Sequence, residues 1–240
     1  MIEASNLSKH FGAKTVVKDL SFTVARGEVL GFLGPNGAGK STTMRMVTGF
    51  IAPSSGDAKI FGVSVVDHPK QAKSHCGYLP ESAPLYDDMT VFDFLKFCAE
   101  MRGLSGSAGK DAVGEVIDTC FLDNVARQSI GTLSKGYRHR TCLAQSLLHD
   151  PDVLILDEPT DGLDPNQKYE VRNLIKRLGK EKAILFSTHI LEEVDAACTR
   201  AVIIDQGSIV ADGTPEQLRE QSGSNSLQDL FRSLTTKETD

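Results

Sequence analysis

The 240-residue sequence predicts an α/β fold, and three observations along the chain lead to this class. Short runs of β-branched and apolar residues, bounded by turn residues, recur and are typical of buried strands. Helical patterns lie between these runs, as in a sheet whose strands are connected through helices. The alternation stops between residues 88 and 149, where helical patterns follow one another without a convincing strand. We therefore expect an α/β core with an inserted helical subdomain.

Each strand and helix is predicted from its own run of residues. The predicted strands are SFTV at 21–24, VLGFL at 29–33, VLIL at 153–156, AILFST at 183–188 and AVIID at 201–205. Helical patterns occupy 40–50, 166–180 and 191–200 between the strands, and 90–104, 110–125 and 133–150 in the interrupting stretch. We expect one domain, with a core of residues 1–87 and 150–213 and a helical subdomain of residues 88–149. A short amphipathic helix and a frayed end are expected at 214–240.

Composition excludes several classes of protein. With 40% hydrophobic and 24% charged residues, the chain is typical of soluble globular proteins, and its net charge of -6 argues against broad nucleic-acid binding. No window approaches 18 consecutive apolar residues, and the start lacks a signal-peptide pattern, so we expect the chain to stay in the cytoplasm. The five cysteines form no C-x-x-C pair, which predicts free and mostly buried thiols.

A glycine-rich loop follows the predicted strand at 29–33. GPNGAGKS fits the Walker A pattern G-x-x-x-x-G-K-[ST], in the strand-to-helix context that this pattern requires. Such a loop lets backbone N–H groups converge on phosphates, while its lysine adds a positive charge and its serine offers a hydroxyl to Mg²⁺. The residues expected to bind the phosphates are Gly34, Pro35, Asn36, Gly37, Ala38, Gly39, Lys40, Ser41 and Thr42.

Because a phosphate loop is common to kinases, GTPases and motor proteins, a second motif has to choose among them. VLILDEPT places two carboxylates at the end of a predicted strand, as in the Walker B element. Asp157 is expected to hold Mg²⁺ through water. Glu158 faces another direction and is expected to take a proton from an attacking water as the general base. The sequence has no N-K-x-D motif of the kind that a GTPase uses for guanine.

A third motif is the turn of Ser134, Lys135 and Gly136, which opens an amphipathic segment. The first backbone N–H groups of a helix have no intrahelical partner, so this turn is a potential anion site. The phosphate loop, the carboxylates and this turn together resemble an ATP-binding cassette (ABC) ATPase, the nucleotide-binding subunit of a transporter, over nearly the whole chain. The resemblance implies a P-loop NTPase with a RecA-like α/β core, an N-terminal antiparallel β part and an inserted helical subdomain.

The resemblance also implies cofactors and partners. ATP and Mg²⁺ are expected, in a homodimer that sandwiches two ATP molecules between the Walker loops of one copy and the signature turn of the other. A separately encoded membrane permease is the other expected partner. The chain would then lie peripherally on the cytoplasmic face of the inner or plasma membrane, and no nucleic acid is expected.

Further site residues are implied by their match to the family's motifs. Ser134 and Gly136 fall in the signature turn, which donates to the γ-phosphate held by the second copy. Phe11 is similar to the aromatic residue that stacks on adenine, although a core aromatic is the alternative. His189 falls on the switch histidine that reaches the γ-phosphate, and Asp164 on the loop that contacts the opposing subunit.

Three residues depart from the family's pattern. Glu81 stands where a glutamine usually touches Mg²⁺; a carboxylate also suits this ion, and a solvated loop glutamate is the alternative. The signature turn, usually L-S-G-G-Q, here has Lys135 and Tyr137. The Lys135 ammonium can attract either phosphate or a neighbouring acid, and the sequence does not decide between them.

The subfamily is suggested by four segments. LSKGY, GYLPE, PLYDDMTV and LQDLFRSLT resemble the exporter branch, which includes gliding-motility, multidrug and polysaccharide export ATPases. We therefore expect an ATPase that powers export by a membrane permease. The alternatives are an ATP-driven switch acting on nucleic acid or a protein complex, and a small-molecule P-loop kinase. The transported substrate is not written in the sequence.

Overall fold

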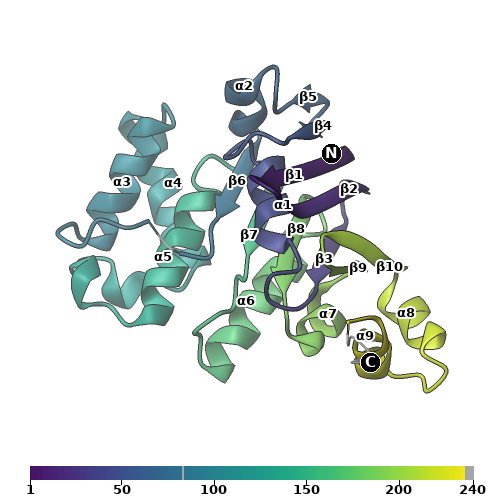
Figure 1. Ribbon diagram of the computed structural model, residues 1–240. Helices are drawn as coiled ribbons and strands as arrows, with labels where there is room; N and C mark the ends of the chain where they lie inside the picture. Colours follow the sequence, from purple (N-terminus) through teal and green to yellow (C-terminus); the bar gives the residue numbers. More distant parts are fainter. Residues whose placement is uncertain (83, 236–240) are drawn as a thin grey trace.

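Two β-sheets form the centre of the molecule, for which a computed structural model describes residues 1–82 and 84–235 (Figure 1). An antiparallel sheet has the strand order β2-β1-β4-β5, and a larger sheet has the order β10-β9-β3-β8-β7-β6. In the larger sheet the strands from β9 to β6 run parallel, and β10 is antiparallel to β9. This arrangement confirms the predicted α/β class with an antiparallel part at the N-terminus.

The strand bounds show which elements the sequence predicted. The antiparallel sheet consists of β1 (Ile2–Phe11), β2 (Lys14–Val24), β4 (Ser55–Ile60) and β5 (Val63–Ser64). The larger sheet consists of β3 (Val29–Leu33), β6 (Cys76–Leu79), β7 (Val153–Asp157), β8 (Ala183–Thr188), β9 (Arg200–Asp205) and β10 (Ser208–Gly213). Strands β3 and β8 have the predicted bounds, whereas β1, β4, β5, β6 and β10 were not individually predicted. Their short or polar sequences carry a weaker signal than the fully buried runs.

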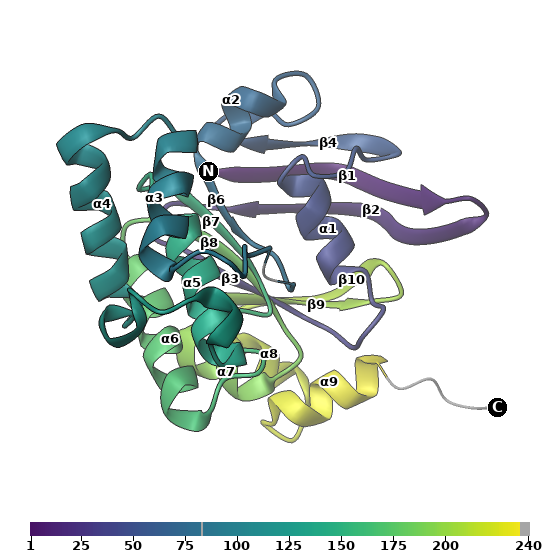
Figure 2. The same cartoon turned by 90° about the vertical axis from the view of Figure 1, so that its left-hand side faces the viewer.

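The parallel strands alternate their side chains between two cores. Leu154 and Leu156 of β7 belong to the core on the side of the inserted helices, and Val153 and Ile155 to the core beneath the antiparallel sheet. This follows from the two-residue period of a strand. Helix α1 (Lys40–Val47) packs between the two sheets, where it contacts β1, β2, β4 and β7 (Figure 2). The loop before α1 is therefore anchored on both sides.

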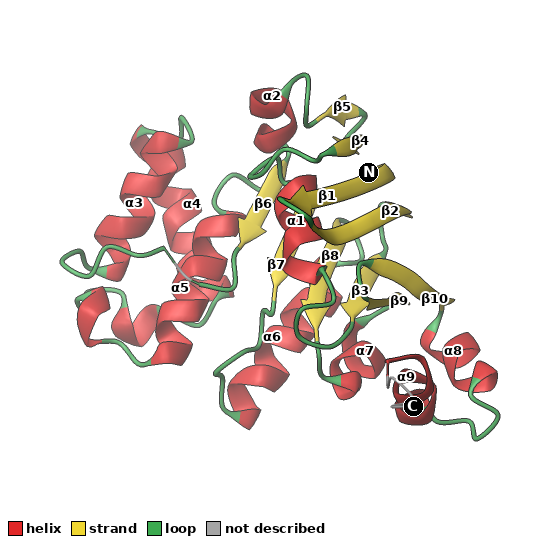
Figure 3. Cartoon of the chain, viewed as in Figure 1, coloured by secondary structure: helices red, strands yellow, loops and turns green. Residues whose placement is uncertain are grey.

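Residues 88–149 form helices, which Figure 3 shows grouped beside the end of the larger sheet. They are α3 (Val91–Met101), α4 (Gly106–Thr119) and α5 (Lys135–Leu147), with 3₁₀ turns at Asp123–Val125 and Ile130–Thr132. No strand runs through the described residues of this stretch, which has only an isolated bridge between Thr90 and Ser129. Helix α5 also packs against β6, so it connects this group to the sheet. The exact domain boundaries at 87, 149 and 213 stay a prediction.

The remaining helices surround the core. They are α2 (Pro69–Ser74), α6 (Pro165–Leu178), α7 (Leu191–Ala197), α8 (Pro215–Gln221) and α9 (Leu227–Thr235). Helix α6 packs on the same face of the larger sheet as the inserted helices. The C-terminal part therefore holds two helices where one was predicted, because the turn at 222–226 separates two amphipathic segments. Leu218, Leu227 and Leu230 pack these helices onto β9 and α7. The predicted frayed end, residues 236–240, lies outside the described residues.

Two further predictions concern the chain as a whole. All five cysteines are free, and Cys76, Cys120 and Cys142 are buried, which confirms the prediction of free thiols. Burial raises the pKa of the Cys120 thiol to about 12, so this sulfur stays protonated and unreactive at neutral pH. Within residues 1–82 and 84–235, every helix falls short of the length and apolar character needed to span a membrane.

Candidate functional site

The site forms where the parallel strands end. The carboxyl ends of β3, β6, β7 and β8 meet at one edge of the larger sheet, because parallel strands share their direction. These four strands are followed by the loop before α1, by the loop containing Glu81, by Glu158 and by His189, and Asp157 is the last residue of β7. Ligands of open α/β sheets bind at such an edge. The fold thus brings together motifs that lie up to 149 positions apart, from residue 40 to residue 189.

The glycine loop depends on two close backbone approaches. A Cβ atom at Gly34 would lie 2.4 Å from the carbonyl oxygen of Ile204. At Gly39 φ is +107°, and a Cβ atom would lie 2.9 Å from the carbonyl oxygen of Val16. Only glycine fits both positions. Gly39 is also the N-terminal cap of α1, so the loop presents the free N–H groups of that helix to the site.

A cavity of about 260 Å³ lies over this loop. Its lining comes from the glycine loop, from the loop after β6, from the end of β7 and from β2: Val16, Asn36, Gly37, Gly39, Lys40, Ser41, Thr42, Glu81 and Glu158. Ligand pockets usually measure about 300–1,000 Å³, so this open cavity is small for a whole nucleotide. The size suits a phosphate chain and a metal ion.

Phe11 lies outside that lining. It ends β1 at the turn into β2, its side chain is 52% exposed, and the Lys9 ammonium lies 5.2 Å from its ring centroid. Val16 of β2 lines the cavity instead, a residue that the sequence analysis missed. An exposed aromatic ring at this turn is free to stack on a base. The adenine contact of Phe11 stays a prediction.

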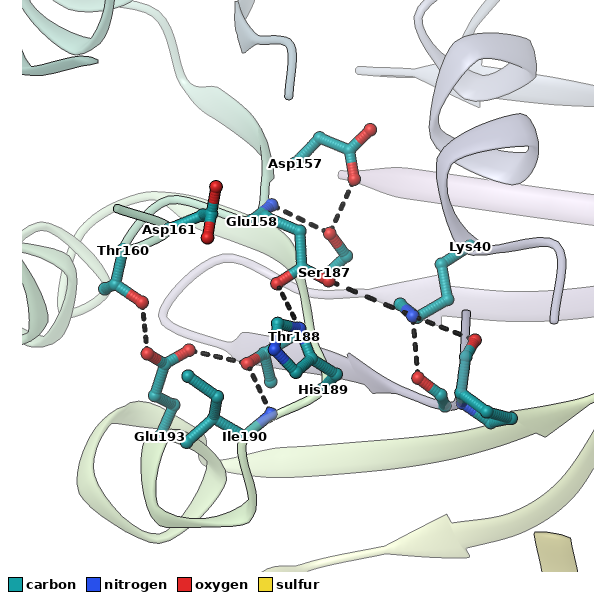
Figure 4. A network of polar contacts seen from close by, with 12 residues as sticks. Lys40, Asp157, Glu158, Thr160, Asp161, Ser187, Thr188, His189, Ile190 and Glu193 are labelled. Carbon is teal, nitrogen blue, oxygen red and sulfur yellow. Dashed lines mark hydrogen bonds and ion pairs between the residues drawn. The ribbon is translucent and has the colours of Figure 1, made fainter. Parts of the chain in front are cut away.

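Lys40 is the buried cation of the site. Its side chain is 6% exposed, and Nζ donates to the carbonyl oxygens of Gly34 at 2.7 Å and Pro35 at 3.2 Å (Figure 4). Oε1 of Glu158 lies 3.9 Å from the same nitrogen. Burial lowers the pKa of Lys40, and the carboxylates of Glu158, Asp157 and Glu81 oppose that shift. The ammonium is thus held over the phosphate loop by groups of its own chain.

Asp157 is completely buried at the end of β7. Its Oδ1 accepts from the Ser41 hydroxyl at 3.1 Å and from the Ser187 hydroxyl at 2.6 Å. Its Oδ2 is buried without a hydrogen-bond partner among the described residues. Because an unpaired buried carboxylate oxygen is costly, this atom calls for a further ligand. A carboxylate oxygen beside a hydroxyl is the donor set that Mg²⁺ prefers.

Glu158 points elsewhere because its backbone is unusual. Its φ of +52° lies in the left-handed region that side chains rarely adopt, a strain of about 1–3 kcal/mol that clusters at active sites. Oε2 lies 3.0 Å from Nδ1 of His189, and the backbone N–H donates to the Ser187 hydroxyl at 2.9 Å. Burial raises the pKa of the Glu158 carboxyl, against the opposing effects of His189 and Lys40. A raised pKa makes the carboxylate a better proton acceptor.

A hydroxyl and carboxylate network behind this pair was also missed from sequence. The hydroxyls of Thr160 and Thr188 donate to the buried carboxylate of Glu193, and Ser187 bridges Asp157 and Glu158 (Figure 4). The only sequence signals were the Ser-Thr pair that ends the strand AILFST and the paired glutamates after His189. Neither signal names the partners Asp157, Glu158 and Thr160, which lie about 30 residues earlier in the chain.

The signature turn lies away from the cavity. Ser134 is the exposed N-terminal cap of α5, and its hydroxyl accepts from the backbone N–H of Tyr137 at 3.4 Å. No residue of this turn lines the cavity over Lys40, and Gly136 is buried against the Gln167 side chain. Within one chain, therefore, the structure does not bring Ser134 and Gly136 to the phosphate loop.

Of the two partners left open for Lys135, phosphate or a neighbouring acid, the single chain provides the acid. Its Nζ lies 2.8 Å from Oδ2 of Asp161 in the same chain, and its aliphatic stem crosses Gly162, where a Cβ atom would lie 2.5 Å from Lys135 Cδ. The hydrogen bond from Lys135 lowers the pKa of Asp161. Asp164, three residues further on, caps α6 by accepting from the Gln167 N–H at 3.0 Å. The loop after Glu158 is thus connected to both α5 and α6.

The site geometry agrees with comparisons to known proteins. The family model described as ABC transporter matches residues 17–161. The linearmycin resistance ATP-binding protein LnrL of Bacillus subtilis is 36% identical over 228 residues, which cover 95% of this chain and 73% of that protein. The Nod factor export ATP-binding protein I of Burkholderia lata is 40% identical, with 91% of this chain and 72% of that protein covered.

A solved structure described as the ATP binding subunit of an ABC transporter is similar over the whole fold. It aligns with a TM-score of 0.89 and 31% sequence identity, covering 98% of this chain and all of that chain. This likeness confirms the predicted P-loop NTPase fold, and the family match confirms the resemblance inferred from the motifs. The chain therefore belongs to the ABC transporter family, as one of its ATP-binding and ATP-hydrolysing subunits.

Proposed function

We propose that the chain is the ATPase subunit of an export-type transporter, in which two copies enclose two ATP molecules and drive a separate membrane permease. The names of the two relatives, one a resistance protein and one an export protein, support the direction of transport. One observation carries the proposal: beside the phosphate loop, the Glu158 carboxylate lies within 4 Å of both Lys40 Nζ and His189 Nδ1. The transported substrate lies outside what these residues specify.

The phosphates of ATP bind to the loop before α1 in this proposal. Lys40 exchanges its carbonyl partners for phosphate oxygens, whose charge matches the ammonium and the N-terminus of α1. Ser41, the unpaired Oδ2 of Asp157 and the Glu81 carboxylate would hold Mg²⁺, consistent with the donor set described above. A bound Mg²⁺ would neutralise charge on the phosphates.

Glu158 is the proposed general base for hydrolysis. Its carboxylate lines the phosphate cavity, and burial favours proton uptake from a water that attacks the γ-phosphate. Nδ1 of His189 lies 3.0 Å from Oε2 of this carboxylate, so the imidazole is placed to orient the base. Its contact with the γ-phosphate rests on its match to the family's switch histidine, since His189 is not among the residues that line the cavity. A positioned base of this kind contributes about 10²–10⁴ to the rate.

A second copy supplies the signature turn in this proposal. Ser134 and Gly136 lie away from the cavity of their own chain, and the cavity is open and small for a whole nucleotide. The N-terminus of α5 would bind the γ-phosphate held by the other copy, and Asp164 would lie at the contact between copies. ATP then favours the closed dimer, and phosphate release favours its opening.

The membrane partner has a candidate surface beside the Glu81 loop. A groove of about 630 Å³ is lined by core residues, by Arg102 directly after α3 and by Gln145 of α5. Its lining includes the cations Arg45, Lys73 and Arg102 and the exposed ring of Phe50. An acidic segment of the permease with an apolar side chain would complement it. The chain would then work at the cytoplasmic face of the membrane, where the permease is inserted.

Replacing the base provides the test. Glu158→Gln should lower the steady-state ATPase rate by about 10²–10⁴ while ATP binding persists, because glutamine cannot accept the proton. The variant should also accumulate as a dimer with ATP, measured by light scattering. Glu181→Gln, an exposed glutamate outside the cavity lining, is the matched control and should behave like wild type. An unchanged ATPase rate in Glu158→Gln would contradict the proposed base.

A further inference from the structure

Glu193 is a buried carboxylate that the proposed chemistry does not use. Its residue is 2% exposed, it lies on α7, and no lysine, arginine or histidine among the described residues forms an ion pair with it. Buried carboxylates are rare without such a partner, because removing a charge from water is costly. The carboxylate must therefore be satisfied by hydrogen bonds, and its donors show what it holds.

Two hydroxyls donate to Glu193. Thr160 donates to Oε1, and Thr188 donates to Oε2 at 2.6 Å (Figure 4). Both threonines are buried, at 3% and 0% exposure. The hydroxyl of Thr188 also accepts from the backbone N–H of Ile190 at 3.0 Å, so its proton is directed at Glu193. Position 193 therefore requires an acceptor toward Thr188.

These donors come from the two segments that carry the proposed catalytic pair. Thr160 lies two residues after Glu158, and Thr188 directly precedes His189. The Glu158 carboxylate and the His189 ring meet at 3.0 Å on the cavity side, and the Glu193 contacts join the same two segments on the buried side. A carboxylate bonded to both segments restricts their separation.

We propose that Glu193 is a positioning residue, which fixes His189 against Glu158 through the hydroxyls of Thr188 and Thr160. The inference rests on the roles proposed above for Glu158 and His189. It assigns no contact with ATP to Glu193, because this residue does not line the cavity. Loss of the network should therefore slow hydrolysis and leave ATP binding intact, since a displacement of about 1 Å near a reacting group can cost about 10²-fold in rate.

The test removes the acceptor or one donor at constant size. Glu193→Leu and Thr160→Val should each lower kcat by about ten- to a hundredfold, with the KM for ATP within about twofold of wild type. Glu193→Gln should retain most of the wild-type rate, because the glutamine carbonyl can accept from Thr188 and its amide can donate to the Thr160 hydroxyl. Thr160→Ser keeps the hydroxyl and should likewise retain most of the wild-type rate. Glu192→Gln, an exposed neighbour on α7, is the matched control and should not change the rate.

A second measurement separates positioning from simple structural damage. In a His189→Ala background, Thr160→Val should cost little further rate, since no imidazole remains to be positioned; independent damage would instead multiply the two losses. Thr160→Val keeps the volume of the side chain, so it tests the inference even if Glu193→Leu does not fold. A wild-type kcat in folded Thr160→Val, or multiplied losses in the double variant, would overturn it.

The outcome can be distinguished from failure of the proposed function. If Glu158→Gln is inactive while the Thr160 and Glu193 variants have wild-type kcat, the positioning role is wrong and the base assignment stands. If Glu158→Gln hydrolyses ATP at the wild-type rate, the base assignment is wrong whatever the Glu193 variants do.

Discussion

The two helix N-termini proposed to bind ATP differ in how much of the site their own chain provides. At α1, Lys40 is buried among carbonyl oxygens, and Ser41 and Glu158 lie beside it. At α5, Ser134 is exposed, and its hydroxyl accepts from the backbone N–H of Tyr137, the one hydrogen-bond partner of this hydroxyl among residues 1–82 and 84–235. An anion site with several converging groups binds by itself, whereas an exposed turn adds contacts only when another surface approaches. In the proposed dimer, each chain would therefore provide most of one phosphate site and the turn that completes the other.

The largest expected effect is on ATP binding, which should depend on the N-terminus of α1 and not on that of α5. Lys40→Ala should weaken ATP binding by roughly ten- to a hundredfold, because hydrogen bonds to charged groups are worth about 1.5–3 kcal/mol. Ser134→Arg should leave ATP binding to the single chain unchanged but abolish ATP-dependent dimerisation and hydrolysis. Fluorescent ATP titration and light scattering measure these quantities. Equal loss of ATP binding in both variants would remove the distinction between the two regions.

Mixing the two inactive chains sharpens the comparison. In a mixed dimer, the Lys40→Ala chain still offers Ser134, and the Ser134→Arg chain still offers Lys40, so one composite site is intact. Half of randomly mixed dimers are of this kind, so up to about a quarter of the wild-type ATPase rate should return. The control is each variant at the same total concentration. If activity does not rise on mixing, the signature turn does not act on a neighbouring copy.

The helix of the signature turn, α5, also carries a source of acid sensitivity. Burial lowers the pKa of His139 on α5 to about 4, and both of its ring nitrogens lack partners among the described residues. The unfolded chain takes up this proton near pH 6.5, the folded chain only near pH 4, so stability falls as pH decreases through this window. Between about pH 7 and about pH 5, this histidine should lower the free energy of unfolding by about 2 kcal/mol.

Urea unfolding of a His139→Leu variant checks this. Between the two pH values, the free energy of unfolding of this variant should fall by about 2 kcal/mol less than that of wild type. His68→Gln, an exposed histidine outside α5, should lose as much as wild type. The same acid sensitivity in wild type and His139→Leu would show that the buried histidine is not its source.

The smallest effect concerns the ion pair beside the signature turn. Lys135 and Asp161 are 68% and 49% exposed, and pairs of this kind contribute about 0.2–1 kcal/mol. Lys135→Glu should therefore lower the ATPase rate by no more than about fivefold, and adding Asp161→Lys should restore it. The effect should shrink at high salt. A loss that the charge swap does not restore would mean that Lys135 acts on something other than Asp161.

Local sequence carried much of the fold and part of the site. The phosphate loop, the carboxylates at the end of β7 and the histidine after β8 were recognised because each lies at or directly after the end of a short buried strand, within a contiguous motif. The strands β1, β4 and β6 were not individually predicted, because half-exposed or very short strands lack a clear two-residue pattern. Glu193 was missed for another reason: its partner Thr160 lies 33 residues earlier in the chain, and the sequence around Glu193 is that of an ordinary surface helix.

By itself, the sequence determined the chemistry that is encoded in runs of neighbouring residues: the strands, the glycine loop before Lys40 and the order of the carboxylates. Such runs specify local backbone geometry, which depends on steric and hydrogen-bonding preferences of a few residues. Only the tertiary structure decided that Lys135 pairs with Asp161, that Glu158 meets His189, and that Glu193 joins the segments behind them. These contacts depend on which strands lie side by side in the sheet, and that order is set by packing of the whole chain.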